Sequence, residues 1–425
     1  MSNDVPNLFS GGEVNENTLS KKGVLKANSL KKILSIPSNY VGNKKRLLIH
    51  ISDMVDSNNL DFKRVIDPFS GSGVVSLFFN SMGYPTISND ILSSSSMAIL
   101  ALLKGKQVEI METDLDYIFS NIFPPLTDFC LKNYNNVYFT EKECLFLDQC
   151  KSNIVRLVGN EFSVSEFKSL SIIPSYEKEK GFKTFGFRTF ETNLKATVLL
   201  FLLEKAIIDI CFVGGRYYNG QIMAKPEHRL AHDRNNNRNL ISMLRKKIKW
   251  MFKIYEKTFT FKDSIVYNDD VNYVLDQVFI ENNNDTLVYL DPPYGKNSSD
   301  YSNLYRFSEE FLYEDKLENL NHIKDGGKKF NNKKEYNKHF CEVLDKCSKA
   351  KYLLISFNAS SFNSIEKICE IIKKYKKNIL VKSIPIAYNY RKNRTNFDCV
   401  EKVIESNEEE IKVENSEREF LILAQ

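Results

Sequence analysis

The stretch Leu287-Val288-Tyr289-Leu290-Asp291-Pro292-Pro293-Tyr294 joins four apolar residues to an acid, two prolines and a tyrosine. Four consecutive apolar residues are typical of a short buried strand. Proline has no N–H to donate to a sheet ladder, so we expect the strand to end at Asp291. In an open α/β sheet, ligands bind just beyond the carboxyl ends of the parallel strands. The sequence therefore predicts an α/β fold with a ligand site at Asp291 to Tyr294.

These four residues suit the capture of an exocyclic amine on a nucleobase. Such an amine is a poor nucleophile because its lone pair is delocalised into the ring. The carboxylate of Asp291 and the carbonyl of Pro292 can each accept one amine hydrogen, and the fixed φ angles of Pro292 and Pro293 hold the backbone in place. The ring of Tyr294 can stack on the base. A plain strand-end turn explains the tetrapeptide equally well, because Asp and Pro are ordinary turn residues.

A glycine-rich loop near the N-terminus supplies a candidate nucleotide site. The predicted strand Arg64-Val65-Ile66 is followed by Asp67-Pro68-Phe69-Ser70-Gly71-Ser72-Gly73, and a helix is expected over residues 74–82. Strand, glycine loop and helix in this order form a nucleotide-binding first turn. A dinucleotide fingerprint would carry its third glycine where Ser76 stands, and the loop lacks the pattern of a P-loop. The loop therefore disfavours nicotinamide, flavin and ATP sites.

Two further features could complete such a site. Asp90 follows a predicted strand over residues 85–88 and lies 17 residues after Gly73. That offset is close to the ~20 residues at which an acid on the second strand reaches ribose hydroxyls. Lys44 precedes a predicted helix that begins near Leu47, and a helix N-terminus with a nearby lysine suits a carboxylate. An ordinary turn with a surface lysine is the alternative for this second feature.

Four motifs occur in one order along the chain: Tyr40-Val41-Gly42-Asn43-Lys44, residues 67–73, Asn89-Asp90 and Asp291-Pro292-Pro293-Tyr294. In this order they resemble the Dam-like, alpha-class DNA adenine methyltransferases, over roughly residues 36–100 and 263–425. The resemblance implies methyl transfer from S-adenosylmethionine (SAM) to N6 of adenine in double-stranded DNA, without a metal. It also implies a Rossmann-like sheet, mostly parallel with an antiparallel last strand, and a largely helical inserted target-recognition domain.

In the family that the chain resembles, the first three motifs hold SAM and the fourth is catalytic. The implied catalytic residues are Asp291, Pro292, Pro293 and Tyr294. The implied cofactor-binding residues are Tyr40, Lys44, Asp67, Phe69, Gly71, Gly73, Asp90 and Asp270. Asp270 is the best match to an acid that the family carries at the edge of the cofactor adenine, and Asp269 is the alternative. An adenine inside a duplex must be flipped out of the stack to reach such a site.

The resemblance divides the chain into four parts. We expect a flexible tail at 1–30, the first part of the methyltransferase domain at 31–110, an inserted target-recognition region at 111–262, and the second part of the methyltransferase domain at 263–425. An insertion of this length cannot be a plain loop, and its apolar patterning predicts helices over 114–121, 141–157 and 194–212.

The latter part of the insertion is basic. Residues 216–249 hold nine Lys or Arg against two acids, and such side chains position DNA phosphates and contact guanine edges. A solvated basic helix over residues 240–252 is the alternative. A polar loop and the aromatic segment 304–307 should follow the catalytic motif, and a basic, aromatic loop at 388–394 should separate the last two strands, 379–386 and 420–423. The Lys-, Asn- and Gly-rich stretch 324–338 predicts a mobile loop, and Asn363 and Glu366 stand at capping spacing for a helix over 364–375. The predicted DNA contacts are Arg216, Arg229, Arg234, Arg238, Tyr305, Arg391 and Arg394.

Composition limits the other function classes. The chain has 425 residues, is 42% hydrophobic and carries a net charge of +5, which permits a nucleic-acid partner without demanding one. Eight cysteines form no Cys-x-x-Cys pair, which argues against a zinc site and favours reduced thiols in a cytoplasm. The N-terminus is polar and predicts no signal peptide.

Two alternatives to adenine methylation of DNA stay open at this point. The acceptor could be cytosine N4 or adenine in RNA, although Asp at the head of the catalytic motif favours adenine because cytosine-N4 enzymes commonly carry Ser there. The chain could also be a non-catalytic DNA-binding specificity subunit, which the intact motifs disfavour. A cognate restriction enzyme is a partner that the resemblance allows but does not require.

Overall fold

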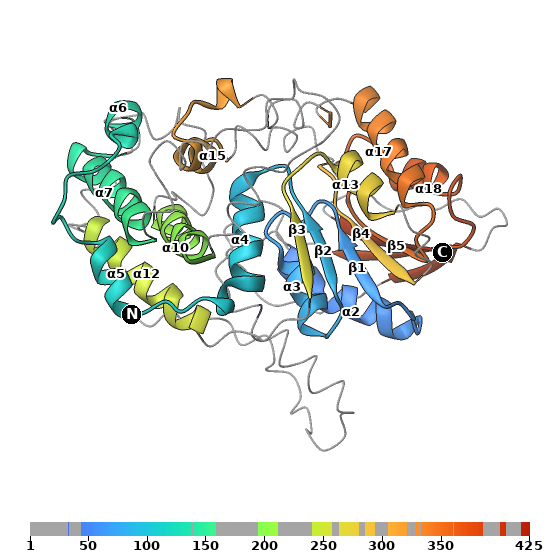
Figure 1. Cartoon of the computed structure of the whole chain (residues 1–425). Helices are drawn as coiled ribbons and strands as arrows, with labels where there is room; N and C mark the ends of the chain where they lie inside the picture. Colours follow the sequence, from blue (N-terminus) through green and yellow to red (C-terminus); the bar gives the residue numbers. More distant parts are fainter. Residues whose placement is uncertain are drawn as a thin grey trace, which may run out of the picture.

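The computed structural model contains one mixed sheet flanked by helices, with a separate group of helices beside it (Figure 1). The structure describes residues 33, 44–135, 137, 139–158, 194–210, 240–256, 263–279, 285–293, 305–320, 323, 329–330, 333–359, 361–385, 400–404 and 418–425.

The sheet has the strand order β3-β2-β1-β4-β5-β8-β6-β7 within the described residues. Five strands pair in parallel: β1 (Arg64–Asp67), β2 (Thr86–Asn89), β3 (Ser264–Tyr267), β4 (Thr286–Leu290) and β5 (Tyr352–Asn358). The last strand, β8 (Arg418–Ala424), lies antiparallel between β5 and β6 (Ile379–Pro385). This confirms the predicted mostly parallel sheet with an antiparallel last strand.

Side chains of the central strands alternate between the two faces of the sheet, and each face packs against its own apolar cluster. Leu287 and Tyr289 of β4 point to one apolar cluster, whereas Val288 and Leu290 point to the other. A strand buried on both faces has a continuous apolar sequence, as the segment 287–290 does. The first cluster includes residues of α2 (Leu48–Ser57), α3 (Val74–Ser81) and α4 (Ser93–Lys104), and the second those of α13 (Val271–Val278), α17 (Lys333–Cys347) and α18 (Ile365–Ile372).

A second group of helices lies on the far side of α4 from the sheet (Figure 1). Its helices are α5 (Glu112–Ile118), α6 (Phe129–Tyr134), α7 (Glu141–Leu157), α10 (Leu194–Ile210) and α12 (Leu240–Glu256). Helix α10 contacts α4, α7 and α12, and α7 contacts α5 and α6, so the group shares the first apolar cluster with the sheet. The largely helical structure that the sequence predicts for this part of the chain is confirmed. No helix in the described part of the chain is both long enough and apolar enough to cross a membrane.

Three sequence expectations were wrong at the level of single elements. The Lys- and Asn-rich stretch 324–338 predicts a mobile loop, but α17 begins at Lys333 and buries Tyr336 and Phe340 at helical spacing. Strand β7 (Val400–Ile404) was missed, because it pairs with β6 as an edge strand and is rich in charge. Helix α18 was expected to be capped by Asn363, whereas Ser364 accepts the N–H of Lys367.

Candidate active site

Four parallel strands bring acidic side chains to one edge of the sheet. Asp67 is the last residue of β1, Asp90 follows β2, Asp269 follows β3 and Asp291 follows β4. Because β1 to β4 are adjacent and parallel, their carboxyl ends lie side by side. The edge therefore unites the glycine loop with the Asp-Pro-Pro segment, which are more than 200 residues apart in the sequence.

The glycine loop after β1 is fastened to the end of β2. Asp90 accepts the backbone N–H of Gly71 on Oδ2 and that of Leu92 on Oδ1, each at 2.8 Å. Ser70 donates its N–H to the Asn89 carbonyl at 2.9 Å, and its hydroxyl accepts the Asn89 N–H at 3.0 Å. Burial raises the pKa of Asp90 to about 6, even though these backbone hydrogen bonds favour its charged form. Asp90 thus shapes the loop in addition to any contact with a ligand.

Gly73 closes the loop in a conformation that suits glycine alone. Its φ is +72°, in the left-handed region, and it occupies the N-cap of α3. A Cβ atom at this position would lie 2.5 Å from Cγ1 of Ile99 on α4. The glycine therefore allows the loop backbone to approach α4 closely.

Asp67 is almost completely buried behind the loop. Its Oδ2 accepts the Ser76 hydroxyl at 2.6 Å, whereas its Oδ1 is buried without a hydrogen-bond partner among the described residues. Burial, reinforced by the charges of Asp291 and Asp90, raises the pKa of Asp67 to about 7. A buried acceptor without a partner is costly, so a cationic or hydrogen-bonding ligand at this edge would satisfy it.

Asp291 is held by two side chains from other elements. Its Oδ2 forms an ion pair with Nζ of Lys44 at 2.9 Å, and its Oδ1 accepts the hydroxyl of Ser356 at 2.8 Å. Pro292 is buried and Pro293 is half-buried beside it. The predicted cofactor residue Lys44 therefore contacts the predicted catalytic carboxylate directly, a contact that the sequence alone did not suggest.

The opposite end of the site contains residues that sequence reasoning missed. Asp270 accepts the Asn272 N–H as the N-cap of α13 and pairs with Lys329. The next residue, Phe330, meets Phe69 of the glycine loop edge to face, with ring centroids 5.7 Å apart. Lys329 and Phe330 lie in the stretch whose composition predicts mobility, and no motif marks them.

Helix α15 (Arg306–Tyr313) follows the Asp-Pro-Pro segment in the sequence and binds the first turn of α4. The Glu309 carboxylate accepts the N–H groups of Ser93 and Ser94 at 3.1 and 2.9 Å, and the Ser94 hydroxyl at 2.6 Å. Burial raises the pKa of Glu309 to about 7. Because Ser93 lies three residues beyond Asp90, α15 supports the carboxyl end of β2, to which the glycine loop is fastened.

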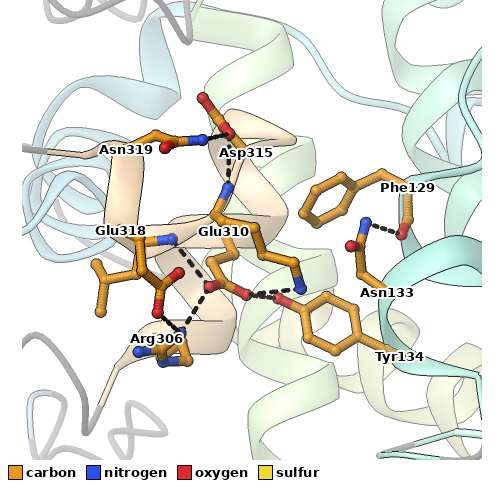
Figure 2. Close-up of polar contacts among 10 residues, drawn as sticks. Phe129, Asn133, Tyr134, Arg306, Glu310, Asp315, Glu318 and Asn319 are labelled. Carbon is orange, nitrogen blue, oxygen red and sulfur yellow. Dashed lines mark hydrogen bonds and ion pairs between the residues drawn. The ribbon is translucent and has the colours of Figure 1, made fainter.

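The same helix is anchored to the inserted helices on its other side (Figure 2). Buried Glu310 accepts the hydroxyl of Tyr134 on α6 and the N–H of Leu317 at 2.9 Å, and it pairs with Arg306 at 3.2 Å. Lys151 of α7, also buried, donates to the carbonyls of Phe311 and Leu312. Residues 306–313 thus join the insertion to the edge of the sheet.

This placement corrects one expectation. The segment 304–307 predicts a loop over the site with aromatic side chains available to DNA, but Arg306 begins a helix and Tyr305 is only 3% exposed. Tyr305 belongs to the apolar cluster and has no free face for DNA. The amphipathic pattern of Phe307, Phe311 and Leu312 is the signal that could have revealed the helix.

Some basic side chains of helix α12 bind other parts of the protein. Arg245 donates to the Phe119 carbonyl at 3.1 Å, and Lys249 pairs with Asp116 at 2.8 Å. The remaining predicted contacts and two motif residues lie outside the described residues: Tyr40, Arg216, Arg229, Arg234, Arg238, Tyr294, Arg391 and Arg394.

The fold and the edge site together define an α/β methyltransferase. Comparison with known proteins specifies the family: residues 40–376 match the model of the D12 class N6 adenine-specific DNA methyltransferases. The chain belongs to this family and is an adenine-specific DNA methyltransferase. It is also similar to a protein of Haemophilus parahaemolyticus, the Type II methyltransferase M2.HphI, with 24% identity over 353 residues that cover 82% of this chain and 91% of that protein.

The family confirms the predicted class of enzyme and settles the two alternatives left open by the sequence. An adenine-specific family favours N6 of adenine over N4 of cytosine, and a DNA methyltransferase family is catalytic and acts on DNA.

The buried carboxyls predict that the protein loses stability as the pH rises. Asp67 and Glu309 have pKa values raised to about 7, and Asp90 to about 6, so the folded state binds more protons than the unfolded state between pH 4 and 7. The free energy of unfolding should therefore fall across this window, by on the order of 1 kcal/mol per pH unit for each carboxyl, and level off above it.

Urea denaturation at pH 5, 6, 7 and 8 measures this dependence. The variant Glu309→Gln keeps the shape of the side chain but cannot ionise, so its stability should depend less steeply on pH. A wild-type stability that rises between pH 5 and 7, or an unchanged slope in the variant, would contradict the burial of these carboxyls.

Proposed function

We propose that this enzyme transfers a methyl group from SAM to N6 of an adenine that is flipped out of duplex DNA at a specific sequence. The observation that carries the proposal is the placement of Asp291 at the carboxyl edge of the sheet, next to the strand that leads into the glycine loop. There the carboxylate is held on both oxygens, by Lys44 and Ser356.

The residues at this edge fit SAM. Gly71 and Gly73, both at positive φ, allow the tight turn of the loop, and the unpaired Oδ1 of Asp67 is an acceptor suited to the ammonium group of the methionine part. Phe69, Asp90 and Asp270 would line the remainder of the SAM site, with Tyr40 as a further candidate from the first motif. When bound, SAM supplies an electrophilic methyl group on a sulfonium.

The protein's own part in the reaction is to hold the adenine amine. We propose that Asp291 and the Pro292 carbonyl accept the two N6 hydrogens, which frees the nitrogen lone pair for in-line attack. Pro293 stiffens the backbone, and Tyr294 stacks on the flipped base. Positioning two reactants in this way can contribute ~7–11 kcal/mol to lowering the barrier.

Target recognition would fall to the inserted helices and the basic, aromatic segment 388–394. Arg216, Arg229, Arg234, Arg238, Arg391 and Arg394 are the proposed contacts to DNA. The relative's name, Type II methyltransferase, supports a role beside a restriction enzyme of the same specificity. Such an enzyme would be of prokaryotic or phage type and would act in the cytoplasm, at the nucleoid.

Long-read sequencing of DNA from cells that express the protein tests this proposal, because it reports both the modified base and its sequence context. We expect N6-methyladenine in one short sequence motif, and none in cells that express Asp291→Ala. Methylation of adenines without a common motif would contradict site specificity, and N4-methylcytosine would contradict the proposed acceptor.

A further inference from the structure

We infer that Ser356 and Tyr289 are positioning residues for Asp291, forming a buried hydrogen-bond relay that fixes the orientation of its carboxylate. The inference rests on the proposed role of Asp291 in holding the adenine amine.

The relay follows from the pairing of two strands. Leu290 of β4 is the register partner of Ile355 of β5, so Ser356 lies beside Asp291, one position further along. The Ser356 hydroxyl is 2.8 Å from Oδ1 of Asp291, and the Tyr289 hydroxyl is 3.0 Å from Oγ of Ser356. Tyr289 and Asp291 are two residues apart and therefore project from the same face of β4.

The direction of the relay is determined by chemistry. An ionised carboxylate only accepts hydrogen bonds, so Ser356 must donate its single proton to Asp291. The Tyr289 hydroxyl must then donate to Ser356. Burial, together with the nearby Asp291 charge, raises the pKa of Tyr289 well above its ordinary value, so the phenol keeps its proton at every working pH. Tyr289 and Ser356 are each about 1% exposed, so solvent does not compete for these bonds.

The relay has a consequence for the adenine amine. Ser356 holds Oδ1 and Lys44 holds Oδ2, so the plane of the Asp291 carboxylate cannot rotate freely. Each oxygen keeps a second lone pair, and the direction of that lone pair is fixed by the bond already made. A preorganised acceptor needs no rearrangement when the amine arrives, which is how a fixed polar group contributes to rate.

Single-turnover methylation of duplex DNA tests the relay. Ser356→Ala should lower the rate constant about 10-fold to 100-fold, the factor for one hydrogen bond to a charged group, with little change in the Kd of SAM. Ser356→Thr keeps the hydroxyl and should restore most of the rate. Ser88→Ala is the matched control, because Ser88 is a buried serine of the same sheet whose hydroxyl has no partner among the described residues.

A double-mutant cycle separates the relay from a structural role. Tyr289→Phe alone should lower the rate constant by less than Ser356→Ala does. When Tyr289→Phe is added to the Ser356→Ala protein, the rate constant should not fall further, because Tyr289 acts only through Ser356. Additive effects, a wild-type rate in Ser356→Ala, or equal rates in the Ala and Thr variants would overturn the inference. If Asp291→Ala itself were fully active, the proposed function of Asp291 would fail instead.

Discussion

Asp291→Asn is expected to reduce the single-turnover rate of DNA methylation by ~10²–10³, the usual cost of removing one preorganised polar partner. The amide keeps the shape of the side chain but has one acceptor oxygen in place of two. In this site both carboxylate oxygens already accept a bond, from Lys44 and from Ser356. An amide nitrogen would face one of these donors or the adenine amine, and neither contact is a hydrogen bond.

The affinities for SAM and DNA should stay close to wild type in this variant, because the substitution affects how the adenine amine is held and not how the two ligands bind. Asp285→Asn is the matched control: Asp285 precedes the other end of β4 and pairs with the exposed Lys63. We expect Asp285→Asn to react at the wild-type rate. A fully active Asp291→Asn enzyme would mean that another group holds the amine.

Gly73→Ala is expected to weaken SAM binding at least tenfold and to destabilise the protein. A left-handed conformation costs an alanine about 1–2 kcal/mol, and the new Cβ would also lie 2.5 Å from Ile99. The clash forces the glycine loop away from α4. Since the loop is tied to Asp90 through Gly71, the displacement reaches the proposed SAM-binding residues.

Gly83→Ala separates the backbone strain of a positive φ from the steric clash with α4. Gly83 also has a positive φ, +95°, but a Cβ there would meet nothing within 4 Å. This variant should lose thermal stability and bind SAM like the wild type. Calorimetric titration with SAM and thermal unfolding of both variants provide the comparison. Equal SAM affinities in the two variants would show that the packing of Gly73 on α4 is unimportant for the cofactor.

The sequence predicted the parts of the site that depend on local pattern. Apolar runs that stop at an acid identify β1 and β4 and place Asp67 and Asp291 at strand ends. The predicted strand over residues 85–88 places Asp90 just beyond the end of β2. These predictions hold because strand ends in a parallel sheet meet at one edge, whatever the rest of the chain does.

The parts that could not be predicted depend on pairing between distant segments. Ser356 reaches Asp291 only because β5 lies next to β4 in one particular register. Lys329 and Phe330 reach the site from a stretch of polar composition, and Glu309 reaches α4 from a segment that follows the Asp-Pro-Pro-Tyr motif by fewer than 20 residues. No local sequence pattern predicts these contacts, since the tertiary fold must bring the two residues of each contact together.

The most direct measurement of the central claim is mass spectrometry of the nucleosides from duplex DNA after incubation with the purified protein and SAM carrying an isotopically labelled methyl group. We expect labelled N6-methyl-2′-deoxyadenosine with the wild-type protein and at least a hundredfold less after the same short reaction with Asp291→Asn. Label in N4-methylcytosine, or equal amounts of labelled N6-methyladenine from both proteins, would contradict it.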